Sequence, residues 1–155
     1  MTDINSDAIR IARTTAEVNG IPADEFRLHQ SDLASDLLKK MENKAYVLIF
    51  NPPYMPTPEE EVGSNGIEAS WAGGKDGCVV LERALPQIAR LLVIPCGVAY
   101  IVAVEDNYPE QIARMMMDEY GIEVLTRMRR RARNEFLTIL KMKPTREFGP
   151  CEGTS

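Results

Sequence analysis

The fold is decided by one stretch, AYVLIFNPPY at residues 45–54. Its first six residues are almost all apolar, and such a run predicts a strand that is buried on both faces, as in a parallel sheet. The strand has to end at Asn51, because the two prolines that follow have no backbone N–H to donate to a central strand. The sequence therefore predicts a buried strand that runs into an asparagine-containing turn.

Helical and strand patterns alternate on both sides of this stretch. The expected elements are a helix capped at residue 5 or 6 and ending near 19, a strand at 26–29, a helix at 32–41, a helix at 79–92, a buried strand at 97–104, a helix at 109–120, and strands at 122–128 and 136–142. This alternation predicts an α/β fold, an open sheet with helices on both faces. Ligands of such sheets bind at the carboxyl ends of the strands, which here points to Asp3, Asp32 and Asn51.

Composition limits the possible classes of protein. The chain has 155 residues, of which 45% are hydrophobic and 26% charged, as expected for one globular domain. Its net charge of −5 argues against a general grip on nucleic acid, so DNA is not the expected partner. The longest apolar stretch, residues 91–104, is shorter than the roughly 20 residues of a membrane span, and the start lacks the features of a signal peptide. We expect a protein of the cytoplasm, or also of the nucleus.

Residues 51–54 carry the chemistry. The prolines Pro52 and Pro53 fix the backbone so that the Asn51 side-chain oxygen and the Pro52 carbonyl accept hydrogen bonds from one NH2 group, while Tyr54 offers a ring face to the planar group that carries it. An amide nitrogen is a poor nucleophile, so holding it in line with an electrophile would be an effective contribution to catalysis. The three cysteines include no CxxC pair, and no metal site is expected.

This turn and the segments at 47–54, 61–64 and 67–77 resemble the eukaryotic HemK-like release-factor glutamine methyltransferases, over a range from Thr2 to about Lys141. The resemblance implies a Rossmann-like class I methyltransferase sheet with S-adenosylmethionine as cofactor. Asp3 matches the residue that binds the cofactor ribose, and Asp32 with Leu33 matches the pair that holds the adenine. Asn51 matches the residue that contacts both cofactor and target, and residues 61–77 match the substrate-side loop.

The resemblance also implies a reaction and partners. The reaction is methyl transfer to the side-chain amide of a glutamine in a class-I translation release factor. The partner is a small zinc-binding activator subunit that forms a heterodimer by pairing with the sheet edge near residues 26–29. Methylation of a DNA adenine amino group or of a protein lysine is the alternative within the same chemistry.

The family also has a first strand and a Gly-rich loop before the ribose-binding acid, whereas Asp3 is here the third residue. The glycines at 63, 66, 73, 74 and 77 follow the NPPY turn and do not replace that loop. The expectation is a partial methyltransferase domain at 1–143, lacking the first strand and the Gly-rich loop, with a mobile tail at 144–155. A non-catalytic short form that binds a partner is the second hypothesis.

One basic cluster stands out in this acidic chain, with arginines at 127, 129, 130, 131 and 133. It is expected between the last two strands, as a solvated hairpin tip. The functional alternative is contact with an acidic partner or with RNA.

Overall fold

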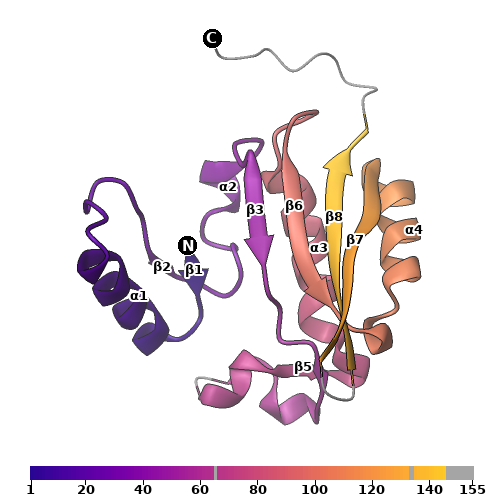
Figure 1. Cartoon of the computed structure of the whole chain (residues 1–155), viewed down its shortest axis with the longest axis horizontal. Helices are drawn as coiled ribbons and strands as arrows, with labels where there is room; N and C mark the ends of the chain where they lie inside the picture. Colours follow the sequence, from indigo (N-terminus) through magenta and orange to yellow (C-terminus); the bar gives the residue numbers. More distant parts are fainter. Residues whose placement is uncertain (65, 133–134, 146–155) are drawn as a thin grey trace.

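The computed structural model describes residues 1–64, 66–132 and 135–145 and has the α/β architecture that the sequence predicts (Figure 1). The prediction of helices on both faces differs in one respect, because the two long helices after β3 pack on the same face of the main sheet. Its elements in chain order are β1 (Thr2–Asp3), α1 (Ser6–Val18), β2 (His29–Gln30), α2 (Leu38–Met41), β3 (Val47–Phe50), β4 (Met55–Pro56), β5 (Ala72–Gly74), α3 (Val79–Leu91), β6 (Val98–Ala103), α4 (Pro109–Tyr120), β7 (Ile122–Ala132) and β8 (Glu135–Pro144). Short 3-10 turns lie between several of them.

The main sheet has the strand order β3-β6-β8-β7. β3 and β6 are parallel, with Phe50 opposite Ile101, and β8 is antiparallel to both β6 and β7. β1 and β2 form a separate parallel pair, which lies on the side of β3 away from β6 (Figure 1). β4 and β5 form a third pair, directly after the NPPY turn. The result is a mixed sheet that ends in a long antiparallel hairpin.

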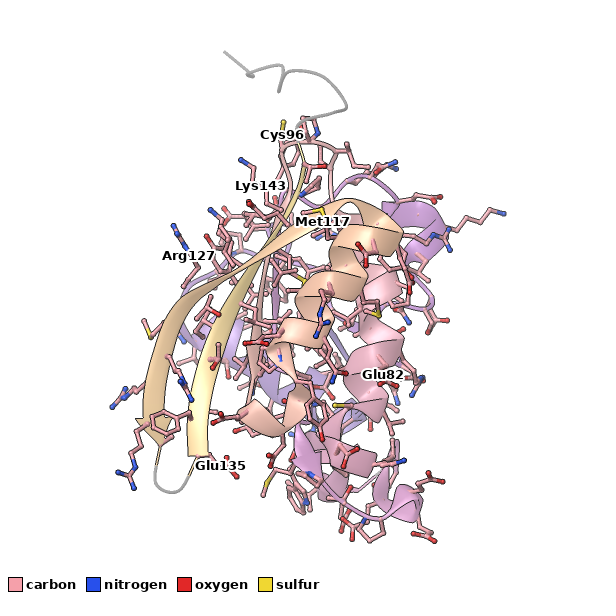
Figure 2. All side chains as sticks on the ribbon, turned by 90° about the vertical axis from the view of Figure 1, so that its right-hand side faces the viewer. Glu82, Cys96, Met117, Arg127, Glu135 and Lys143 are labelled. Atoms are coloured by element: carbon pink, nitrogen blue, oxygen red, sulfur yellow. The ribbon has the colours of Figure 1, made fainter. Side chains whose placement is uncertain are left out.

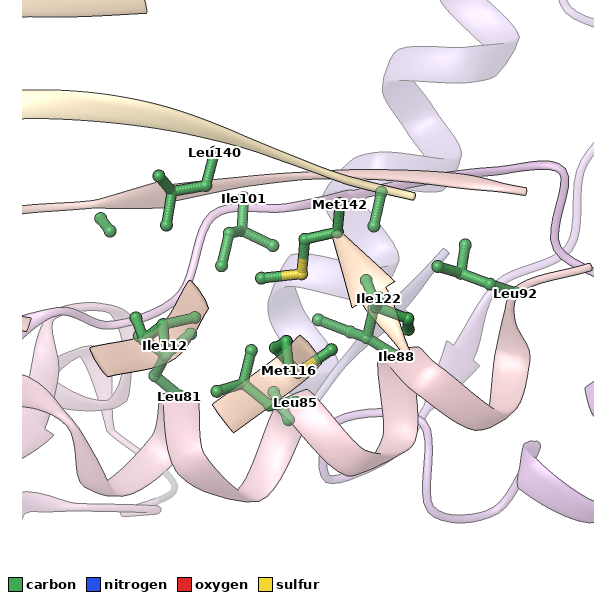
Figure 3. Packing of buried hydrophobic residues seen from close by; sticks show 13 residues of the cluster. Leu81, Leu85, Ile88, Leu92, Ile101, Ile112, Met116, Ile122, Leu140 and Met142 are labelled. Carbon is green, nitrogen blue, oxygen red and sulfur yellow. The ribbon is translucent and has the colours of Figure 1, made fainter. Parts of the chain in front are cut away.

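The core lies between the main sheet and the two helices α3 and α4, which pack on one face of it (Figure 3). The largest side chains at its centre are almost completely buried, namely Leu81, Leu85, Ile101, Met116, Leu140 and Met142. Along β6 every second residue is buried, as expected for a strand with one covered face. Burial of such side chains contributes about 1.5–3 kcal/mol each, which makes this interface the main source of stability.

Several predicted helices are confirmed. The Asn5 side chain caps α1 by accepting hydrogen bonds from the amides of Asp7 and Ala8. α4 begins at Pro109 and ends before Gly121, which adopts the left-handed conformation typical of a helix stop. The helix predicted at 79–92 is α3, which contains Pro86.

Two predictions near the N-terminus are wrong in their extent. The helix predicted at 32–41 is reduced to the four residues of α2. Leu33 has a φ of 56°, which excludes a helix through this residue, and residues 34–37 form turns. The strand predicted at 26–29 is the two-residue β2, since β1 offers only Thr2 and Asp3 for pairing.

The prediction that residues 45–50 are buried on both faces is also wrong. Leu48 and Phe50 pack against the core, but Val47 is 62% and Ile49 80% exposed. The physical reason is that α3 and α4 cover only one face of β3, and that β1 belongs to a separate sheet and does not pair with the open edge of β3. Alternate side chains of β3 therefore point to an uncovered face.

The last two strands are longer than predicted. β7 continues to Ala132, so Arg127, Arg129, Arg130 and Arg131 lie within a strand and not at a hairpin tip, while residue 133 lies outside the described residues. The strand predicted at 136–142 is β8, which extends to Pro144. Of the predicted tail at 144–155, the part from 146 onward lies outside the described residues. No helix in the described ranges is long and apolar enough to span a membrane.

Candidate functional site

The NPPY turn follows β3 at the edge of the sheet where the parallel strands end. Pro52 is almost completely buried, whereas Asn51 is exposed and Pro53 and Tyr54 are half-buried. The proline acts as an anchor, because its fixed φ and buried ring leave the turn little freedom. The Asn51 side chain is thus presented at the surface from a rigid support.

Asn107 holds this turn in place from the end of β6. Its side chain is 1% exposed, and its Nδ2 donates to the carbonyl oxygens of Tyr54 at 3.3 Å, Asp76 at 3.3 Å and Gly77 at 3.2 Å. Its Oδ1 accepts a hydrogen bond from the Val104 amide at 2.9 Å. An amide NH2 has two protons, so at least one of them is shared between two carbonyls. One buried side chain therefore joins the NPPY turn, the end of β6 and the loop before α3.

That loop packs against the backbone of the NPPY turn, and two of its glycines make this possible. Gly77 has a φ of 68°, and a Cβ atom there would lie 2.0 Å from the Tyr54 carbonyl oxygen. A Cβ at Gly73 would lie 2.8 Å from the Pro53 carbonyl oxygen. Any larger residue would have to push the turn away. The predicted substrate-side loop thus packs directly against the backbone of the NPPY turn.

Asp3 and Asp32 lie at the ends of β1 and β2. The Asp3 carboxylate accepts a hydrogen bond from the Asn5 amide at 2.8 Å, and the backbone oxygen of Asp3 accepts one from Ser31 at 3.0 Å. Parallel pairing places Asp3 opposite Gln30, two residues before Asp32. The structure therefore gathers the predicted cofactor residues of β1 and β2 at one corner.

Helix α3 fixes the loop after β2. The Asp32 carboxylate forms an ion pair with Arg83, and both side chains are 46% exposed. The Ala34 amide donates to Gln87 Oε1 at 3.0 Å, and Leu33 packs against the core. α3 thus connects this loop to the same core that supports β3. The predicted residues form two groups, Asp3 with Asp32 and Leu33 at one corner and Asn51 to Tyr54 at the other.

Next to Gly77, the thiol of Cys78 is half-buried, and its Sγ donates to the Asp76 carbonyl at 3.4 Å. Burial raises the pKa of this thiol, and the negative charge of Glu82 raises it further. Cys78 is therefore protonated at neutral pH, and we assign it no nucleophilic role.

Sequence reasoning missed Asn107 and the close packing of Gly73 and Gly77. A usable signal was present for Asn107, because it follows the strand predicted at 97–104 and precedes the helix that begins at Pro109. The rule that singled out Asn51, a polar residue after a buried strand, applies to it equally. The glycine contacts depend on two segments meeting in space, and the sequence carries no local sign of that.

A mixed α/β sheet, a separate β1–β2 pair that ends near acidic residues, and an NPPY turn after a parallel strand are consistent with the class I methyltransferase fold that the sequence predicts. No family model matches the chain. It is 40% identical over 140 residues to "Methyltransferase HEMK2" of Homo sapiens, covering 90% of this chain and 63% of the human protein. It is 34% identical over 152 residues to "eRF1 methyltransferase catalytic subunit mtq2" of Schizosaccharomyces pombe, covering 92% of this chain and 62% of that protein.

A third relative is a "Putative protein N5-glutamine methyltransferase" of Methanocaldococcus jannaschii, 33% identical over 90 residues, which cover 58% of this chain and 42% of that protein. Among solved structures, Mtq2 in the Mtq2-Trm112 complex of E. cuniculi shares the fold, with a TM-score of 0.55, 22% identity, and coverage of 77% of this chain and 62% of that one. The chain is thus similar to HemK-like methyltransferases over about 90% of its own length. It spans less than two thirds of the length of these relatives.

Proposed function

We propose that this chain is the catalytic part of a methyltransferase that transfers a methyl group from S-adenosylmethionine to the side-chain amide nitrogen of a glutamine in a class-I translation release factor. The relatives from S. pombe and M. jannaschii, whose names refer to eRF1 and to protein glutamine N5, support this choice of target. The net charge of −5 supports a protein acceptor over the adenine alternative, because it repels a polyphosphate strand.

The observation that carries the proposal is the exposed Asn51 side chain on a turn that is anchored by Pro52 and Asn107. In this proposal the Asn51 Oδ1 and the Pro52 carbonyl accept the two N–H bonds of the acceptor amide, and the Tyr54 ring packs on its plane. The turn thereby orients the nitrogen lone pair toward the methyl group. Positioning of this kind lowers the entropic part of the barrier without a strong base.

The residues at the ends of β1 and β2 fit the adenosine part of the cofactor. The Asp3 carboxylate is held by the Asn5 amide, an arrangement suited to accepting ribose hydroxyls at a strand end. Asp32, fixed by Arg83, and Leu33 would hold the adenine. When bound, S-adenosylmethionine supplies an electrophilic methyl group on a sulfonium.

We propose a small zinc-binding activator subunit as the partner, pairing with the edge of β2 next to residues 26–29. The neighbour from E. cuniculi was solved as a complex with Trm112, which supports such a heterodimer. β2 is paired with β1 on one side only, so its second edge offers backbone groups for a further strand.

The test is methyl transfer by the Asn51→Ala variant, made in a chain that also carries the family's first strand and Gly-rich loop, with labelled S-adenosylmethionine, a release-factor domain containing its Gly-Gly-Gln loop, and the activator subunit. Losing a contact made in the transition state costs about 3 kcal/mol, so we expect activity to fall about a hundredfold. Asn51 is exposed, and stability should not change. The control is Asn19→Ala, the same substitution at an exposed residue after α1. An Asn51→Ala enzyme with most of its activity would contradict the proposal, as would faster labelling of an adenine-rich oligonucleotide.

A further inference from the structure

The hairpin of β7 and β8 continues beyond the end of the sheet as a two-stranded arm. β6 pairs with β8 only from Ala99 to Ala103, where Ala103 lies opposite Thr138. β7 and β8 continue to pair beyond that point, until Ala132 lies opposite Glu135. Figure 2 shows the end of the hairpin standing out to one side, away from the helices, with Glu135 near its far end. We call residues 127–132 and 135–138 the basic arm; Arg127 and Met128 lie at its base, beside Ile139 and Leu140, which still pair with β6, and the part beyond the sheet begins after Arg129.

The arm carries a local positive charge on an acidic protein. The arginines of β7 at 127, 129, 130 and 131 are all exposed, although the chain as a whole has a net charge of −5. Arg130 lies opposite Leu137 and Arg129 opposite Thr138, so neighbouring arginines point to opposite faces of the ribbon. Arg127 lies at the strand irregularity, and its side chain points away from the helices (Figure 2). A partner can therefore meet positive charge on either face.

The arm is also tied to the candidate site. Arg129 Nη2 lies 3.1 Å from Glu105 Oε2, and its guanidinium lies 4.4 Å from the centre of the Phe136 ring. Glu105 belongs to the turn after β6, in which Asn107 fixes the NPPY turn. The strand register agrees with this, because the arm leaves the sheet opposite Ala103, at the edge where β3 runs into Asn51. A molecule bound at the NPPY turn therefore lies beside the basic arm.

We propose that the basic arm binds an acidic surface of the protein acceptor, next to the glutamine that enters the NPPY turn. This inference rests on the proposed function, since it assigns a role in docking the acceptor of that reaction. An acidic protein surface fits better than RNA because the Phe136 ring already has a guanidinium on its face and is not offered to a base.

The first test measures binding without any methyl transfer. The probes are a fluorescent ten-residue peptide of alternating glutamate and serine, and a single-stranded uridine oligonucleotide of the same charge. The variant is Arg127→Gln with Arg130→Gln, and the matched control is Lys39→Gln with Lys40→Gln, two exposed lysines of α2. Each exposed charge pair is worth about a two- to fivefold change in affinity, so the arm variant should bind the peptide about tenfold more weakly. The control should stay within about twofold of the original chain.

Three outcomes of this test would overturn the proposal. The first is that the peptide does not bind the original chain. The arginines would then have only the role that charges have on many edge strands, which is to prevent pairing with another chain. The second is that the lysine control weakens binding as much as the arm variant, which would make the attraction a matter of total charge. The third is that the oligonucleotide binds more tightly than the peptide.

The second test separates the arm from the proposed reaction. With the release-factor domain as acceptor, the arm variant should raise KM about tenfold and leave kcat unchanged, because the arm binds the acceptor away from the reacting nitrogen. With a short Gly-Gly-Gln peptide that lacks acidic residues, the variant and the original enzyme should have the same KM. An unchanged KM for the whole domain overturns the role of the arm. If the original enzyme methylates neither acceptor, the proposed function fails, and the peptide titration still decides whether the arm binds acidic surfaces.

Discussion

Replacing Asn107 by alanine should loosen the NPPY turn and destabilise the whole domain. This side chain satisfies four backbone groups from three segments, of which the Val104 amide and the Gly77 carbonyl are fully buried. Alanine has no polar atom to replace these bonds and leaves a cavity that is bordered by backbone. The three segments lose the group that holds them together.

The size of the effect follows from burial. A buried polar group that loses its partner costs about 1–3 kcal/mol, and the two buried groups together give an expected loss of about 3 kcal/mol in the free energy of unfolding, after partial relaxation. The carbonyls of Tyr54 and Asp76 are only partly buried and add less, since water reaches them. Domains are stable by about 5–15 kcal/mol, so the variant should still fold.

Urea unfolding followed by circular dichroism measures the global change, and amide hydrogen exchange at Val104 measures the local one. Asn19→Ala is the matched control, because the Asn19 side chain makes one exposed hydrogen bond, to the Thr15 carbonyl, and should cost less than about 0.5 kcal/mol. Asn107→Asp keeps the acceptor for the Val104 amide and loses the amide donor, so protection at Val104 should persist while stability falls. An Asn107→Ala variant within about 0.5 kcal/mol of the original chain would refute the reasoning.

Three further outcomes are expected. Gly77→Ala should lower the free energy of unfolding by about 2 kcal/mol or more, because the new Cβ would collide with the Tyr54 carbonyl and the residue has a positive φ. A urea midpoint equal to that of the original chain would contradict this contact. Alkylation of Cys78, followed by mass spectrometry, should require a higher pH in the folded chain than in urea. The pKa of Cys78 is raised in the folded chain and not in the unfolded chain. The protonated thiol therefore contributes to stability below the pKa of the unfolded chain, and this contribution is lost as the pH rises through the pKa of the folded chain. Because the charge of Glu82 helps to raise this pKa, Glu82→Gln should shift the alkylation profile to lower pH. Asn5→Ala should cost about 1 kcal/mol in helix α1, seen as faster amide exchange there, and unchanged exchange would argue against the cap.

The sequence predicts best where local chemistry decides the structure. α4 has a proline at its start and a glycine at its end, and both boundaries are confirmed. α1 is confirmed for a similar reason, since the Asn5 cap is a local hydrogen-bonding device. The predicted helix at 32–41 fails in its first part, where Leu33 adopts a left-handed conformation that its side chain does not favour, while Leu33 packs against the core and the Ala34 amide donates to Gln87 of α3. Tertiary packing overrides propensity at that position.

β3 shows a second limit of sequence reasoning. An apolar run shows that a strand is compatible with burial on both faces, but it does not show which face of the strand other elements cover. Ile49 is apolar and 80% exposed because the structure places both α3 and α4 on the opposite face of the sheet. The same holds for the arginines of β7, whose charge suggested a loop while strand pairing with β8 determines their place.

In the candidate site, too, some features depend on local sequence and others on tertiary contacts. The chemistry of the NPPY turn is legible in four adjacent residues, because the prolines and the asparagine act where they stand in the chain. Its rigidity comes from Asn107, which is distant in sequence and reaches the turn only because β3 and β6 are parallel neighbours whose ends meet at one edge. Asp3 and Asp32 depend instead on the β1 and β2 pair, which is a separate sheet and is connected to the core through Arg83 and Gln87 of α3. In the proposed site the NPPY turn and the corner at Asp3 and Asp32 thus have different supports, Asn107 for the first and the β1–β2 pair with α3 for the second, so we expect a substitution in one support to leave the other corner in place.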